Sequence, residues 1–191
     1  MQTGRLEAFT DGVVAIIITI MVLELKVPHD GSLAALSESG PILLAYVFSF
    51  INVGLYWNNH HHLMQAAQRV DGRVLWANLF LLFWLSLVPF VIRWLDESDF
   101  APIATAAYGV VLGFAAVGYS LTERAIIRLE GRDSALAQAL GSDWKGKISL
   151  LLYAIAVPLS FHLQWLSVAL YVLVILLWLV PDRRIERVLR G

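Results

Sequence analysis

The sequence predicts an all-α integral membrane protein, and three observations lead to this fold class. Hydrophobic residues make up 59% of the 191 positions and charged residues only 15%, with a mean hydropathy of +0.70. Soluble domains are nearer half apolar and a quarter charged. Six segments carry the roughly 20 apolar residues that a helix needs to cross a bilayer core. Lys and Arg gather on one side of these segments.

The apolar segments predict six transmembrane helices in a single transmembrane domain, 1–191. We expect the helices at 6–27, 41–66, 73–95, 101–122, 147–163 and 165–181. The second segment ends in polar residues, so part of it is expected to leave the hydrocarbon. None of the six shows the alternation of a transmembrane β-strand. The first lacks a basic leader and a small-residue cleavage site, so we interpret it as a true span.

The basic residues predict the orientation of the chain. Twelve of the 14 lie on one side, namely Arg5, Arg69, Arg73, Arg124, Arg128, Arg132, Lys145, Lys147, Arg183, Arg184, Arg187 and Arg190. Only Lys26 and Arg93 lie on the other. Because basic loops stay in the cytoplasm, both termini are predicted to be cytoplasmic, which agrees with an even number of spans. The loop 123–146 is expected to hold helical extensions with a break near Gly141.

Several kinds of chemistry are missing from the sequence. There is no cysteine, and the P-loop, Rossmann and HExxH motifs are absent, so we expect no enzyme, no cofactor and no nucleic-acid partner. The TVGYG filter is also absent, which argues against the P-loop tetrameric channel fold. Three histidines stand together at His60, His61 and His62. Adjacent helical residues point about 100° apart, so we expect interfacial or hydrogen-bonded histidines and no metal site.

The first predicted helix separates into two faces when its residues are placed about 100° apart. Ile16, Thr19, Ile20 and Leu23 fall on one stripe, and Asp11 falls on the far side. The stripe suits helix packing, lipid contact or a pore lining.

Asp11 needs a partner, because a charge inside a span is costly. The next two spans offer candidates, namely Trp57, Asn58, His60, His61, Arg73, Trp76 and Asn78. Either these polar groups join three helices, or Asp11 binds a permeant ion directly.

The stretch "RLEAFTDGVVAIIITIMVL" resembles the R-x-x-x-F-S-D signature of the transmembrane protein 175 family of cation channels, found in lysosomes and in prokaryotes. The matching positions are Arg5, Phe9, Thr10 and Asp11. Thr10 stands where the family usually has Ser, which keeps the hydroxyl.

Two further stretches extend the resemblance to about residue 90. In "WNNHHHLM", Trp57 and His60 are similar to the family's Trp with a His three residues on. In "NLFLLFWLSLVPF", Asn78 and Pro89 are similar to its third-helix pattern.

The resemblance implies a potassium-permeable channel without a P-loop filter, in the plasma membrane of a prokaryote. Family members with two repeats pair as dimers, so this single repeat implies a homotetramer around a central pore for monovalent cations. The implied constriction is at Ile16 and Leu23, with Thr19 or Ile20 between them. Such an apolar ring can gate by dewetting.

The resemblance also implies that Arg5, Phe9, Thr10 and Asp11 hold the base of the pore helix, together with Trp57, His60 and Asn78 on the next two spans. Neutralising Asp11 is then expected to damage assembly or gating more than ion selectivity.

Three points stay open. Thr19 either faces the ions or bonds back to the Ala15 carbonyl. Glu24, with Asp96, Glu97 and Asp99, either attracts cations at the outer mouth or is solvated surface charge. The alternative functions are a secondary or proton-coupled transporter and a membrane scaffold. Pro89 and Pro158 form no matched pair of broken helices, which disfavours a transporter.

Overall fold

The computed structural model describes residues 3–28, 31–131, 134–140 and 143–179. Within these ranges all regular structure is helical. In chain order the helices are α1 (Gly4–Leu23), α2 (Leu33–Glu38), α3 (Gly40–Ala66), α4 (Gly72–Ser86), α5 (Val88–Glu97), α6 (Pro102–Glu130), α7 (Ala135–Leu140), α8 (Trp144–Leu159) and α9 (Gln164–Leu179). The all-α class is thereby confirmed for the part of the chain that the structure describes.

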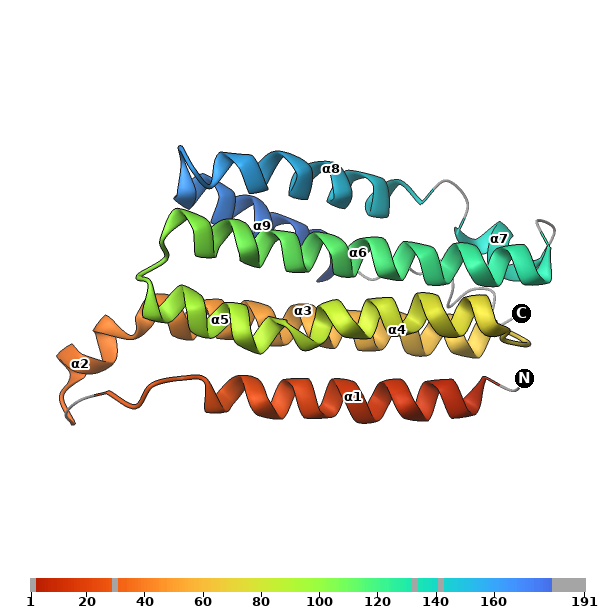
Figure 1. Ribbon diagram of the computed structural model, residues 1–191, viewed down its shortest axis with the longest axis horizontal. Helices are drawn as coiled ribbons and strands as arrows, with labels where there is room; N and C mark the ends of the chain where they lie inside the picture. The colour runs from red at the N-terminus through yellow and green to blue at the C-terminus, as the bar shows by residue number, and fades with distance from the viewer. Residues whose placement is uncertain (1–2, 29–30, 132–133, 141–142, 180–191) are drawn as a thin grey trace.

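Helix α6 is the centre of the bundle, and α1 lies along one edge (Figure 1). Helix α6 packs against α4 and α5 on one side and against α8 and α9 on the other. The approach of α4 is close because Gly118 has no side chain: an added Cβ would lie 2.7 Å from the Leu81 Cα atom. Small residues permit such backbone contact in membrane helices. Helix α1 packs against α3, α4 and α5, so only one of its faces meets the bundle.

The third predicted span, 73–95, is divided into α4 and α5 at Leu87. Asp71 caps α4 by accepting hydrogen bonds from the amides of Arg73 and Val74, each at 3.0 Å. Pro89 lacks an amide hydrogen and sits in the first turn of α5, which interrupts the helical hydrogen bonds at this point. The two helices still form one continuous apolar stretch.

The predicted spans agree with the helices to different degrees. Four helical stretches of the described residues are long and apolar enough to cross a membrane: Gly4–Leu23, Gly40–Ala66, Gly72–Glu97 and Pro102–Glu130. Helices α8 and α9 are shorter, at 16 residues each, so six spans remain a prediction.

Helix α1 ends at Leu23, before the predicted limit of 27. Pro28 also disfavours helical backbone at Val27, the residue before it, so the helix does not resume there. The loop 123–146 contains the end of α6 and the short α7, whereas the expected break near Gly141 lies outside the described residues.

Candidate functional site

Helix α1 has one buried and one uncovered face in the single chain. The buried face contacts the bundle through Leu6, Thr10, Val14, Ile17 and Met21. On the uncovered face, the exposed fractions are 58% for Ile16, 41% for Ile20 and 79% for Leu23, and Thr19 is exposed as well. The stripe derived from helical angles is therefore the face that the rest of the chain leaves uncovered. Ile16 and Ile20 also line a groove of about 410 Å³ between α1 and α5.

A buried hydrogen-bond chain centred on Asn78 holds α1 against α3 and α4. The Asn78 Nδ2 group donates to Thr10 Oγ1 at 2.9 Å, and Asn78 Oδ1 accepts from His60 Nε2 at 2.9 Å. The side chains of all three residues are buried. Because a carbonyl oxygen only accepts, the hydrogen of the His60 ring must be on Nε2. One amide on α4 is thus joined to α1 and to α3 through two hydrogen bonds.

A second set of polar contacts joins α1 to α3 alone. Trp57 Nε1 donates to Asp11 Oδ1 at 2.9 Å, and His61 Nδ1 lies 2.8 Å from Glu7 Oε1. The Gln65 amide bonds the other ring nitrogen of His61 at 2.8 Å. Asp11 is therefore partnered by a tryptophan on the next predicted span.

Sequence reasoning missed Glu7 in this set, although a signal was present. Glu7 lies four residues before Asp11, and His61 lies four residues after Trp57. Two helices that run in opposite directions bring such pairs together at successive turns.

Five of the seven predicted anchoring residues come together in these contacts: Thr10, Asp11, Trp57, His60 and Asn78. Arg5 and Phe9 do not join them within one chain. Both side chains are exposed, and they lie on the same face of α1 as Ile16, three turns (Arg5) and two turns (Phe9) nearer the start of the helix. Their expected anchoring role therefore finds no partner among the described residues of a single chain.

The Thr19 hydroxyl bonds back to the helix, but not to the expected carbonyl. It donates to the Ile16 oxygen at 2.9 Å, one residue further along the chain than Ala15. The hydrogen is thus used within α1, and because the side chain is exposed, the oxygen lone pairs remain available on the uncovered face.

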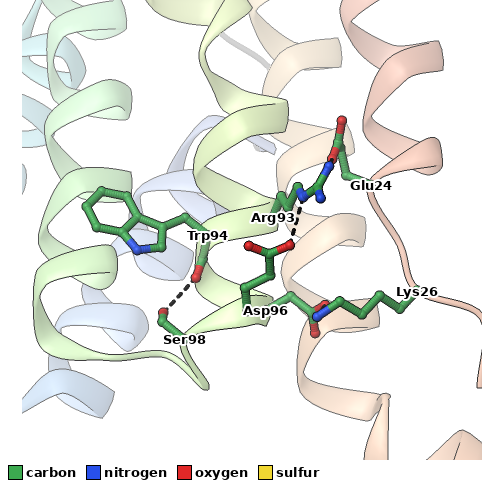
Figure 2. Close-up of polar contacts among 7 residues, drawn as sticks. Glu24, Lys26, Arg93, Trp94, Asp96 and Ser98 are labelled. Atoms are coloured by element: carbon green, nitrogen blue, oxygen red, sulfur yellow. Dashed lines mark hydrogen bonds and ion pairs between the residues drawn. The ribbon is translucent and has the colours of Figure 1, made fainter.

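Ion pairs hold the C-terminal end of α1, which is predicted to face the outside of the membrane. Arg93 Nη1 lies 3.4 Å from Glu24 Oε2, and Arg93 Nε donates to Glu97 Oε1 at 2.9 Å. Lys26 Nζ lies 3.1 Å from Asp96 Oδ2. Figure 2 shows Glu24 and Lys26 reaching from the end of α1 towards Arg93 and Asp96 on α5. Glu24 is thus partly neutralised, which lowers the negative charge it offers to a cation.

The three adjacent histidines have separate surroundings. His60 bonds to Asn78, His61 bonds to Glu7 and Gln65, and the His62 ring packs edge-on against the His61 ring. The hydrogen-bonded interpretation is confirmed for the first two. No group of three or more potential ligand side chains comes together among the described residues.

Comparisons with known proteins show which family and which relatives this chain resembles. The profile of the family described as "Endosomal/lysosomal potassium channel TMEM175" matches residues 5–89. A Chryseobacterium sp. (strain P1-3) protein named a potassium channel is 52% identical over 190 residues, which cover 100% of this chain and 99% of the relative. The human protein named endosomal/lysosomal proton channel TMEM175 is 46% identical over 75 residues, which cover 33% of this chain and 15% of that protein.

A solved structure extends the likeness to three dimensions. The crystal structure of a lysosomal potassium-selective channel TMEM175 homolog from Chamaesiphon minutus superposes with a TM-score of 0.81. The two chains are 30% identical, and the match covers 94% of this chain and 97% of that one.

These likenesses, together with the helical bundle and its apolar spans, define a membrane-embedded ion channel and not an enzyme. The chain belongs to the TMEM175 family. The family resemblance stated from the sequence is confirmed, and the profile begins at Arg5 and ends at Pro89, the first and last residues of the motifs that carried it.

Proposed function

We propose that this chain is a potassium-permeable cation channel that assembles as a homotetramer around a central pore lined by α1. It crosses a prokaryotic plasma membrane six times, with both termini in the cytoplasm. Relatives named potassium channels support the permeant ion, because they match nearly the whole of the chain. The permeant potassium ion needs no resident cofactor.

The observation that carries this proposal is the uncovered apolar face of α1. Ile16, Ile20 and Leu23 leave their side chains exposed, while the opposite face of the same helix is packed against three others. Four such helices around one axis would cover the stripe and enclose a path. The groove beside Ile16 and Ile20 gives room for side chains of a neighbouring subunit.

The gate in this proposal is a ring of Ile16 side chains, with Leu23 forming a second ring two turns further along. An ion in a narrow apolar neck cannot keep its hydration shell, so the ring blocks conduction by dewetting until it widens. Between the two rings, Thr19 oxygens face the path with their lone pairs and supply the polar contacts on which selectivity depends. Glu24 contributes weakly at the outer mouth, because Arg93 shares its charge.

Flux measurements in liposomes test the pore assignment. Ile16→Ala and Leu23→Ala remove bulk from the rings and are expected to raise potassium flux several-fold and to lower discrimination against sodium. Leu151→Ala is the matched control, because Leu151 is 59% exposed on α8 and lies outside the proposed pore. If both α1 variants conduct like the parent, the stripe faces lipid and the assignment is wrong.

A further inference from the structure

A small cavity with several polar wall residues lies between helices on the side of the bundle remote from α1. It is lined by residues of α3, α6, α8 and α9, at the end of the bundle where α6 finishes and α8 begins, and its volume is about 30 Å³. Its wall includes Asn52 and Tyr153 near its inner limit, and Tyr119, Glu123 and Ser149 nearer the end of the bundle. The proposed pore uses none of these residues.

Two polar atoms in this wall have no partner among the described residues: Asn52 Nδ2 and the Tyr153 hydroxyl. Both side chains are deeply buried, with exposed fractions of 6% and 3%. Buried polar atoms in native proteins are bonded to protein or to ordered water, and leaving one unpaired is costly. The two residues come from different helices and line the same small space.

The neighbouring wall groups are largely engaged with one another. The Tyr119 hydroxyl donates to the Asn59 carbonyl at 3.3 Å. Ser149 Oγ donates to the Lys145 carbonyl at 2.8 Å and accepts from a tryptophan at 2.9 Å. These oxygens still have lone pairs. A molecule that both donates and accepts can therefore link them to Asn52 and to Tyr153.

The size of the cavity and the charge near it indicate which molecule it can hold. About 10–15 Å³ of such space holds one water, so 30 Å³ holds about two. The Lys145 ammonium lies 5.8 Å from the ring centre of Trp178, another wall residue, so a positive charge already stands near this cavity. A second cation is disfavoured there. We propose that the cavity is a buried hydration site for about two ordered waters, which bridge Asn52 and Tyr153 to oxygens on α6 and α8.

The site has a structural consequence for α1. Helix α3 carries Asn52 as well as Trp57 and His60, which hold the start of α1. The bridging waters therefore connect the α6–α8–α9 side of the bundle to the helix that positions α1. The hydration site does not depend on the proposed ion path.

The direction in which Tyr153→Phe changes the melting temperature tests the proposal. If waters bridge the site, Tyr153→Phe removes a hydrogen bond and lowers the melting temperature by about 2–4 °C, the shift for roughly one bond in a chain of this size. If the cavity is dry, the same change deletes an unpaired hydroxyl and raises the melting temperature. Tyr46→Phe, on α3 outside the cavity, is the matched control and is expected to leave it unchanged.

A double-mutant cycle sharpens this test. Asn52→Leu is also expected to lower the melting temperature, and the double variant with Tyr153→Phe to lower it by less than the two separate effects combined, because both residues share the same waters. An unchanged or raised melting temperature in the single variants would overturn the proposal. A stabilising effect of potassium would also overturn it. If replacing choline by potassium raised the melting temperature of the parent but not that of Glu123→Gln, the occupant of the cavity would be a cation.

Radical footprinting of the parent protein needs no variant. Water activated by an X-ray pulse labels side chains that it touches, so Tyr153 should be labelled several-fold faster than Tyr171. Tyr171 is equally buried, but its hydroxyl is bonded to Ser160 and to the Thr105 carbonyl. Equal labelling of the two tyrosines would show that no water reaches Tyr153.

Discussion

The two ends of α1 are attached to the bundle by different chemistry. At the start of the helix, Thr10 and Asp11 take part in hydrogen bonds with tryptophan and asparagine side chains, and the Asn78 chain is buried. At the other end, Glu24 and Lys26 form ion pairs with α5, and the Arg93 and Lys26 side chains in these pairs are mostly exposed.

This difference indicates which end of the helix can move. Buried hydrogen bonds between membrane helices are little affected by salt, whereas exposed ion pairs contribute little and are screened. The start of α1 is therefore the fixed end, and the end that carries Leu23 is the one that can shift. A tilt about the fixed end would change the width of the proposed pore most at Leu23 and less at Ile16.

The largest loss is expected from Asn78→Leu, which breaks both bonds of the buried chain. Each bond between membrane helices contributes about 0.6–1.7 kcal/mol, so the free energy of unfolding should fall by about 1–3 kcal/mol. Denaturant titration in micelles measures it. Asn58→Leu is the control, because Asn58 is exposed on α3 and makes none of these bonds. If the two variants are equally stable, the chain does not fix α1.

A smaller loss is expected from Trp57→Phe, which leaves the half-buried Asp11 without its indole donor. We expect a fall of about 1 kcal/mol in the free energy of unfolding. In flux assays, Trp57→Phe and Asp11→Asn should change the size of the current but not the preference between potassium and sodium. A changed ion preference in Asp11→Asn would mean that the carboxylate meets the ions directly, and the anchoring account would fail.

The smallest effect is expected from Arg93→Gln, which removes both ion pairs of that guanidinium. The melting temperature should hardly change. At about 1 M salt the parent and the variant should have the same melting temperature, because charges are then screened beyond about 3 Å. Channel activity should respond more than stability does, because the mobile end of α1 loses its tether. A loss of stability larger than that of Asn78→Leu would reverse the comparison between the two ends.

The sequence predicted the faces of α1 well, because helical periodicity depends only on the chain itself. Angles alone placed Ile16, Ile20 and Leu23 together and Asp11 opposite, and the structure has them so. The sequence also limited the candidate partners of Asp11 to the ends of two predicted spans, because only those segments bring polar groups to the depth of Asp11.

Other features depended on neighbouring helices and could not be predicted in the same way. The pairing of Glu24 with Arg93 requires the rotation of α5, which is set after the break at Leu87. The exposure of Arg5 and Phe9 depends on which face of α1 the bundle covers. The cavity beside Tyr153 forms where four helices meet, and no local sequence pattern predicts it.

The central claim is that the Ile16 face of α1 meets the ion path, and cysteine modification tests it most directly. The chain has no native cysteine, so Ile16→Cys provides a single reactive thiol. A charged, water-soluble thiol reagent should change the potassium flux of the Ile16→Cys channel and leave that of Leu151→Cys unchanged. Equal insensitivity of both variants, with labelling of neither, would place Ile16 in lipid or at a dry interface and contradict the account.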